Sequence, residues 1–435
     1  MNKNSNVIRL AQFNSIPARA LVVCLTIFPL FLLVIRGWVG IVLILAFAIS
    51  AYLLIRNKTK GLSISSENAS RSNLFWLIAT LASPIVSVFL AQLFRQDFSW
   101  RLYDGPAHIL VCIPILIVML QYRIDMGNLL SLAAPGAILF TLIEIIVNPH
   151  VIGDRVTTNF ADLLTFGSLT LTLGLFSLVS INLYGTDSKA IKLFKLFGFV
   201  AGVYLSAISG SRTGWLAFPF ILLFWLIFNG SKHKMFTTVI AIATAVMASI
   251  AAYYFSTTVQ QRIDLGVSEV LTYHWNTLNP VSSVGDRISF FRIAWFLFLQ
   301  NPLGGYDDAG FLTQVNAPEL ARFATQYTRE FVFYHGFHNE ITTSMVRSGI
   351  WGLLSSVALF LVPALFFTSR LTSASAPVNR LALLATCFIF CAFINSMSTE
   401  IFNLKYTASF YALMITCLAG SLMVVEKQSE TSCDT

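Results

Sequence analysis

The sequence contains few charged residues and few cysteines. Of its 435 residues, 11% are charged and 56% are hydrophobic, whereas a soluble domain usually has about 25% charged residues. Five of the six cysteines lie inside apolar runs and Cys433 lies in the C-terminal tail, so no pair falls in a predicted outer loop. The composition excludes an ordinary soluble domain. The cysteines predict neither a disulfide framework nor a cysteine metal site.

The apolar residues form repeated long runs. A bilayer span needs roughly 20 mostly apolar residues, and on this rule we expect about twelve spans. They lie near 20–35, 38–55, 73–94, 107–121, 128–147, 162–182, 196–209, 213–228, 236–255, 341–367, 381–397 and 407–425. The first run has no small-residue cleavage site and is interpreted as an uncleaved span. The sequence therefore predicts an all-α, polytopic membrane protein.

The basic residues predict the orientation and the domain organisation. With the N-terminus inside, every lysine except Lys405 falls on the inner side, as the positive-inside rule expects. We expect spans 1–9 within 1–255, a large periplasmic loop at 256–340, and spans 10–12 with a cytoplasmic tail in 341–435. The predicted chemistry therefore faces away from the cytoplasm.

Arginine predominates over lysine on the predicted outer side. The guanidinium group is a planar fork of donors that binds phosphate or carboxylate in a bidentate manner. This bias indicates an anion site on the outer face. The alternative is ordinary ion pairing with outer acids such as Asp154, Asp264 and Asp286.

The outer loop has helical patterns of its own. Residues 257–273 are partly amphipathic, residues 287–300 combine aromatics with two arginines, and residues 317–330 begin with Pro318, which favours a helix start. The second segment is too short to span and suits an interfacial helix. Together these helices are expected to form a lid over an outward-facing cavity.

Two motifs combine arginine with turn residues. Ser209-Gly210-Ser211-Arg212-Thr213-Gly214-Trp215 lies between two spans. Its backbone amides and Arg212 suit a phosphate, although a polar turn with a snorkelling arginine is an equal alternative. Gly285-Asp286-Arg287 opens the aromatic helix. Arg287 and Arg292 lie on different helical faces, because five residues turn a helix by about 140°, so Arg287 is the candidate ligand. The alternative is that both arginines snorkel from an interfacial helix.

A third motif concentrates histidine. His335-Gly336-Phe337-His338-Asn339-Glu340 holds two of the six histidines and immediately precedes a span. A histidine at this boundary suits a general base near neutral pH. A zinc site is disfavoured because His335 and His338 are both expected in a loop and the spacing provides no third strong ligand. The remaining alternative is a polar loop at a helix entry.

Read in order, these motifs resemble the O-antigen ligase and polymerase superfamily. The matching segments are SGSRTGWLAFP, GDRISFFRIAWFLFLQNPLGGYDDAGF and HNEITTSMVRSGIWGLL, and the resemblance covers roughly residues 150–355. An earlier segment, Asp154-Arg155 through Asn159, resembles the family less closely because Phe160 stands where proline often follows.

The resemblance implies a membrane-type (GT-C-like) glycosyltransferase that needs neither metal nor nucleotide cofactor and inverts the sugar carbon. Its donor would be O-antigen on undecaprenyl diphosphate and its acceptor lipid A–core oligosaccharide, with membrane lipids as further partners and no nucleic acid. It assigns His338, Arg212 and Arg287 to catalysis, with Arg155, Arg212, Arg287 and Ser211 on the diphosphate and His335 and Asn339 in support.

Other functions remain open at this point. Within the superfamily, polymerases join lipid-linked repeat units, and protein O-oligosaccharyltransferases use Ser or Thr acceptors. A lipid-linked glycan transporter would also need outer arginines and many spans, but it would require ionisable residues near the bilayer midplane and related halves. Few midplane charges and no duplicated half occur here. The O-antigen ligase is the favoured interpretation. The glycan structure and the oligomeric state are left open.

Overall fold

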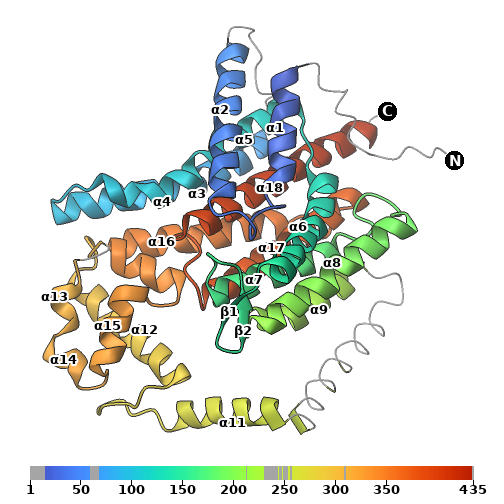
Figure 1. Cartoon of the computed structure of the whole chain (residues 1–435). Helices are drawn as coiled ribbons and strands as arrows, with labels where there is room; N and C mark the ends of the chain where they lie inside the picture. Colours follow the sequence, from blue (N-terminus) through green and yellow to red (C-terminus); the bar gives the residue numbers. More distant parts are fainter. Residues whose placement is uncertain are drawn as a thin grey trace.

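The computed structural model describes residues 15–58, 68–211, 213–229, 257–307 and 310–433, together with 243, 247, 253 and 254. Helices make up nearly all of the regular structure in these residues (Figure 1). The first part contains α1 (Ile16–Ile27), α2 (Trp38–Lys58), α3 (Asn68–Arg95), η2 (Trp100–Tyr103), α4 (Asp104–Leu110), α5 (Cys112–Tyr122), α6 (Gly127–Val147), strands β1 (His150–Ile152) and β2 (Arg155–Thr157), α7 (Leu163–Val179), α8 (Lys189–Ile208), η3 (Thr213–Leu216) and α9 (Ala217–Asn229).

The second part begins with a group of shorter helices and ends with three long ones. It contains α11 (Thr257–Leu271), α12 (Ser283–Gln300), α13 (Leu312–Val315), α14 (Pro318–Ala321), α15 (Gln326–His335), α16 (Glu340–Thr368), α17 (Ala376–Ser396) and α18 (Lys405–Cys433). The group from α12 to α15 lies at one end of the molecule, away from α1 and from the end of α18 (Figure 1).

The expected polytopic helical architecture is confirmed. Eight helical segments of the described chain are long and apolar enough to cross a membrane: α2, α3, η2 to α5 taken together, α6, α8, α16, α17 and α18. Helices α1 and α7 are apolar but shorter. The expected count of twelve is therefore not reached within the described residues. The span expected near 236–255 lies largely outside them.

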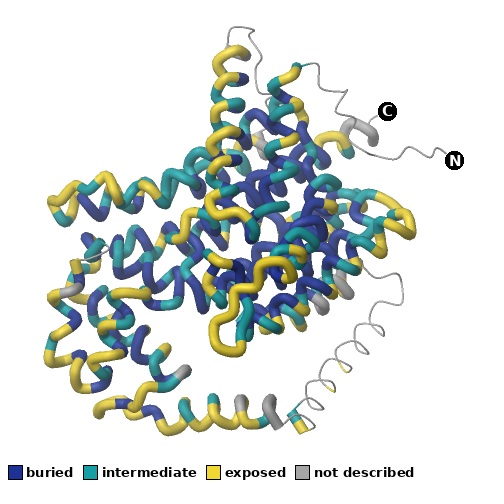
Figure 2. Tube along the Cα trace, viewed as in Figure 1, coloured by how far each residue is buried: buried dark blue, intermediate teal, exposed yellow. Residues whose placement is uncertain are grey.

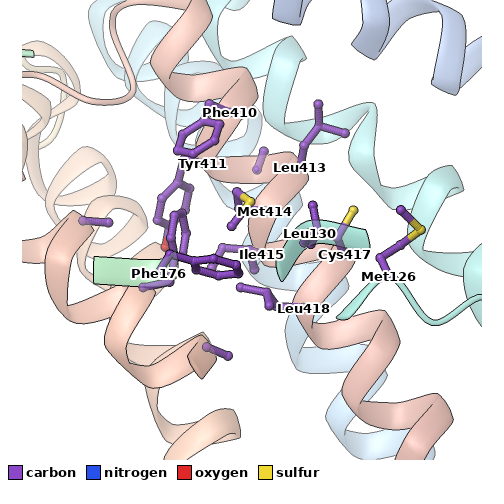
Figure 3. Close-up of a cluster of buried hydrophobic side chains, with 14 of the residues drawn as sticks. Met126, Leu130, Phe176, Phe410, Tyr411, Leu413, Met414, Ile415, Cys417 and Leu418 are labelled. Carbon is purple, nitrogen blue, oxygen red and sulfur yellow. The ribbon is translucent and has the colours of Figure 1, made fainter. Parts of the chain in front are cut away.

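Helix α18 lies at the centre of the hydrophobic core. All residues of its most apolar, membrane-length stretch are buried inside the protein, whereas only a third of the residues in the corresponding stretch of α2 are buried. Tyr411 and Met414 of α18 face Phe176 of α7 in the main apolar cluster (Figure 3). Figure 2 shows the same contrast, with buried residues concentrated in the central helices. The exposed apolar side chains of α2 suit contact with lipid, where an apolar surface carries no penalty.

Helices α7 and α8 pack closely through small residues, and this contact positions part of the site. A Cβ atom added to Gly202 of α8 would lie 2.9 Å from the Gly174 Cα atom of α7 and 2.7 Å from the Thr170 carbonyl oxygen. Small residues allow this backbone approach in membrane helices. As a result, the turn that ends α8 is held against the first turns of α7.

The helices from α12 to α15 share a second hydrophobic core with the start of α16. Ile293 and Leu297 of α12 pack with Leu320, Val332 and other apolar residues of this group. The helix expected at 317–330 is wrong as a single element: α14 ends at Ala321, and α15 begins at Gln326 with the Thr325 side chain as its N-cap. As the N-cap, Thr325 has an extended backbone conformation, so the helix that begins at Pro318 cannot continue through it into α15.

Helix α16 is interrupted within its first three turns. Gly349 has φ 61° and ψ −145°, a conformation essentially restricted to glycine. The loop that follows α12 occupies the break: the Ile350 N–H donates to the Pro302 carbonyl at 2.8 Å, and the Tyr306 N–H donates to the Val346 carbonyl at 2.9 Å. Broken membrane helices persist where other protein groups satisfy the freed backbone, and this loop does so.

Arg95, the last residue of α3, reinforces the same junction. Its Nη1 atom donates to the Gly304 carbonyl at 2.7 Å and to the Arg347 carbonyl at 3.1 Å. One guanidinium group thus joins the loop after α12 to the broken segment of α16. The relative placement of α12 and α16 is fixed by this junction and by their shared hydrophobic core.

Candidate active site

A cavity of about 270 Å³ lies between the start of α7, the start of α12, α15 and the segment before α16. It brings together two of the residues predicted from the sequence, Arg287 and His338. Its lining consists of Leu164, Val281, Ser282, Asp286, Arg287, Phe290, Tyr327, Thr328, Phe331 and His338.

His338 is held in a defined orientation. Its backbone has φ 48°, a left-handed conformation that is uncommon outside glycine. The ring lies 5.3 Å from Phe331, nearly parallel to it, and Nδ1 lies 3.1 Å from the Ser398 carbonyl oxygen. A carbonyl only accepts hydrogen bonds, so Nδ1 carries the hydrogen. In the neutral ring Nε2 is then unprotonated and able to accept a proton.

Glu400 holds the loop that carries His338. Its Oε1 atom accepts hydrogen bonds from the Phe337 N–H at 3.1 Å and from the Thr343 hydroxyl at 2.6 Å. Asn403 donates to its Oε2 atom. Gly336 lies directly against this carboxylate at φ 75°, and an added Cβ atom would overlap it. Glu400 therefore fixes the backbone immediately before the histidine.

Asn339 and His335 occupy different environments. Asn339 is the N-cap of α16: its Oδ1 atom accepts from the Thr342 N–H at 2.9 Å and from the Thr342 hydroxyl at 3.0 Å. His335 is exposed and is the last residue of α15, so the expectation that it lies in the loop is wrong. Its ring contacts Phe331 at 4.7 Å on the outside of the cavity lining.

Arg287 is exposed in the first turns of α12 and lines the cavity beside Asp286. The Asp286 carboxylate accepts a hydrogen bond from the Thr328 hydroxyl at 2.8 Å, which joins α12 to α15. Burial raises the pKa of the Asp286 carboxyl, although the bond from Thr328 opposes the change. The cavity thus presents one cation next to an acid that binds protons more readily than usual.

Arg292 has a different role. Its guanidinium carbon lies 3.7 Å from the centre of the Phe323 ring, and Nη1 donates to the Tyr273 hydroxyl at 3.2 Å. It does not line the cavity. The two arginines of α12 therefore point to different surroundings, as the helical spacing indicated, and Arg292 holds α12 against the segments at 273–275 and 323.

The turn after α8 approaches the cavity from the α7 side. Ser211 is buried, and its hydroxyl donates to the carbonyl of Leu164, a cavity-lining residue, at 3.3 Å. Gly210, at φ 69°, leaves room for Arg155, because an added Cβ atom would lie 2.9 Å from the Arg155 Nε atom. Arg155 and Ser211 are therefore neighbours. Arg212 lies outside the described residues.

Arg155 reaches this turn from a short β-hairpin that the sequence patterns did not predict. In strand β2, Arg155 pairs with Ile152 of β1 across the turn at Gly153-Asp154. The hairpin gives the arginine backbone a fixed position. No three His, Cys, Asp or Glu side chains come together in a metal-binding group anywhere in the part of the chain that the structure describes.

Comparison with known proteins identifies the segment that carries this site. Residues 197–357 match the model of the family described as O-Antigen ligase. Over this segment the chain is similar to the O-antigen ligase family. The match runs from α8 to α16 and includes Ser211, Arg287 and His338, whereas Arg155 precedes it. This match and the candidate spans together support a multi-pass membrane enzyme of the ligase or polymerase type.

One relative is similar over a larger part of the chain. The chain is 25% identical over 342 residues to an uncharacterized protein of Haemophilus influenzae, and the alignment covers 76% of this chain and 80% of that protein. The similarity therefore extends well beyond the family segment.

Three residues of the site were missed by the sequence analysis as contributors: Ser398, Glu400 and Thr328. The polar stretch Ser396 to Glu400 is a short interruption between two apolar runs and gave no sign of its partner. Ser398 lies 60 residues from His338 along the chain. For Glu400, the residue type is the only signal in the sequence, because an acid in a short outer loop suits a fixed polar contact.

Proposed function

We propose that this protein is a member of the O-antigen ligase superfamily and that it transfers a glycan from undecaprenyl diphosphate to lipid A–core oligosaccharide. The site would face the periplasm from a bacterial inner membrane, and the full chain would have twelve spans in a GT-C-like arrangement. The observation that carries the proposal is that Arg287 and His338 line the same cavity, because a cation and a candidate base then face the same bound substrate.

The arginines suit the diphosphate of the donor. Negative charge builds on the leaving oxygen as the sugar–oxygen bond breaks, and a fixed donor at that position is typically worth ~10²–10³ in rate. Arg287 would supply this contact from α12. The buried Ser211 contacts Leu164, which lines the cavity, and Arg155 lies against Gly210 of the same turn. Together with Arg212, they would hold the diphosphate from the side opposite Arg287.

His338 suits the role of the base. The acceptor hydroxyl attacks the sugar carbon, a new carbon–oxygen bond forms, and the bond to the diphosphate breaks with its electron pair leaving on the phosphate oxygen. The hydroxyl proton passes to Nε2 of His338, a step typically worth ~10²–10⁴ in rate. Attack from the face opposite the diphosphate inverts the sugar carbon. No metal ion takes part in this scheme.

The helices around the cavity would keep water away from the donor. Tyr327 and Phe331 of α15 and Phe290 of α12 supply an apolar rim beside His338. Water in this position would hydrolyse the activated glycan, so an apolar rim favours transfer over hydrolysis.

A reconstituted transfer assay tests the proposal. Purified full-length protein is mixed with undecaprenyl-diphosphate glycan and lipid A–core in the presence of EDTA, and the product is followed by gel mobility and mass. Wild type is compared with His338→Ala and Arg287→Ala. The matched controls are His274→Ala and Arg322→Ala, which change exposed residues outside the cavity.

The expected result is glycosylated lipid A–core from wild type and both controls, with losses of at least ~100-fold in the two site variants. Lengthening of the lipid-linked glycan without modification of lipid A–core would instead identify a polymerase. Absence of both products in wild type would exclude both transferase activities for these substrates.

A further inference from the structure

A second cavity, of about 350 Å³, lies on another side of the segment that carries His338. It is enclosed by α3, by η2 and α4, by the first half of α16 and by the segment between α17 and α18. Its lining consists of Pro84, Ser87, Val88, Arg101, Leu102, Asp104, Gly105, Pro106, Asp307, Glu340, Ser344, Arg347, Ser348, Gly352, Ser355, Ser356, Leu359, Phe402, Asn403 and Lys405. Its volume is within the range of ligand-binding pockets.

The charges of this cavity are balanced. Its lining contains three cations and three acids: Arg101, Arg347 and Lys405 with Asp104, Asp307 and Glu340. Lys405 and Asp104 form an ion pair. A balanced lining does not suit a diphosphate, which requires an excess of positive charge, but alternating donors and acceptors suit an uncharged ligand that is rich in hydroxyl groups.

The serines on the wall are arranged as acceptors. The Ser87 hydroxyl donates to the Pro84 carbonyl at 2.8 Å, and the Ser356 hydroxyl donates to the Leu353 carbonyl at 3.0 Å. Each hydroxyl has one hydrogen and two lone pairs, so its remaining capacity is to accept. A ligand with several O–H groups would supply the matching donors.

Glu340 adds a buried acceptor to the same wall. Its side chain is 1% exposed in the protein, and it accepts hydrogen bonds from the Phe402 N–H at 2.7 Å and the Ser344 hydroxyl at 2.8 Å. A carboxylate has about four acceptor positions, so two bonds leave capacity for a ligand. A buried acid in a membrane helix is costly and by default indicates a functional site.

At the mouth, Arg101 offers donors. Its side chain is exposed, and among the described residues its guanidinium group has no hydrogen-bond or ion-pair partner. Planar guanidinium donors and carboxylate acceptors in one pocket match the paired hydroxyls of a sugar ring, which both donate and accept.

The segment that carries His338 contributes residues to both cavities. His338 lines the first cavity and Glu340, two residues later, lines the second. We propose that the second cavity binds a saccharide headgroup of the acceptor substrate, which anchors the acceptor beside His338 while the donor diphosphate occupies the first cavity. This inference rests on the proposed transferase function.

The test uses two variants with matched controls. Arg101→Ala removes donors at the mouth, and Ser356→Phe fills the inner part. Their controls are Arg36→Ala, an exposed arginine outside the cavity, and Leu354→Phe, which enlarges an exposed side chain of α16. Binding is measured first, without turnover, by thermophoresis of the full-length protein with water-soluble core oligosaccharide cleaved from lipid A. The KM of each substrate is then measured in the transfer assay.

The expected result is a rise of ~10-fold in the Kd for core oligosaccharide, which corresponds to about 1.4 kcal/mol. We expect a similar rise in the KM for lipid A–core, an unchanged KM for the donor, and no change in the controls. The proposal is overturned if wild type binds no oligosaccharide, if both variants bind it as wild type does, or if the donor KM alone rises. If wild type binds the saccharide but produces no transfer, the transferase proposal fails while the saccharide site stands.

Discussion

Replacing Glu400 with alanine should slow transfer without weakening substrate binding. The Glu400 carboxylate accepts the Phe337 N–H directly before His338, at 3.1 Å, and lines neither of the two cavities. A hydrogen bond to a charged group contributes about 1.5–3 kcal/mol. If this energy holds the loop in its productive conformation, its loss lowers the productive population by ~10–100-fold, because each 1.4 kcal/mol is about a factor of ten.

The assay for this prediction is steady-state transfer with the full-length protein. We expect kcat to fall by ~10–100-fold in Glu400→Ala, with the KM of donor and acceptor within about twofold of wild type. Glu400→Gln should fall less, because its amide oxygen still accepts from Phe337. Glu319→Ala, an exposed acid of α14, is the control. An unchanged kcat in a folded Glu400→Ala protein would refute the positioning role.

Three further changes have defined outcomes. Asp286→Asn removes a negative charge that repels the diphosphate beside Arg287, and it should tighten binding of undecaprenyl diphosphate by about 1 kcal/mol. Since burial raises the pKa of Asp286, wild-type affinity should fall as pH rises through that pKa, and the variant should lose this dependence in a binding titration. Gly349→Ala should lower the melting temperature in detergent, because its backbone conformation costs about 1–3 kcal/mol for other residues, whereas Gly185→Ala has open space and should not. Asn339→Ala should lose about 0.5–2 kcal/mol of stability with the α16 cap, measured by the same melt; unchanged melting would contradict the cap.

The long apolar helices could be predicted from the sequence because bilayer thickness sets their length. The runs expected at 73–94, 128–147 and 381–397 coincide with most of α3, α6 and α17. The helical spacing on α12 separated Arg287 from Arg292, and their surroundings do differ. These inferences use local pattern alone, which is why they could be made from one sequence.

Contacts between distant segments could not be predicted in this way. The hydrogen bond from His338 to the Ser398 carbonyl joins a loop to the segment after another helix. Because every residue has a backbone carbonyl, the sequence does not indicate which one accepts this bond. The break in α16 was also missed, because a single glycine within an apolar run such as Gly349 is common in a straight membrane helix. The strands β1 and β2 have three residues each, too few for an alternating pattern.

The broken helix explains why residues far from the cavity matter for the proposed chemistry. Arg287 is on α12 and His338 precedes α16, so their separation depends on how those helices are joined. The loop after α12 docks into the break in α16, and at Gly305 an added Cβ atom would lie 2.5 Å from the Arg347 carbonyl oxygen. Only glycine permits that approach. Since a misplacement of about 1 Å can reduce a rate by ~10²-fold, the proposed chemistry predicts that this glycine acts through geometry, by fixing the distance between Arg287 and His338.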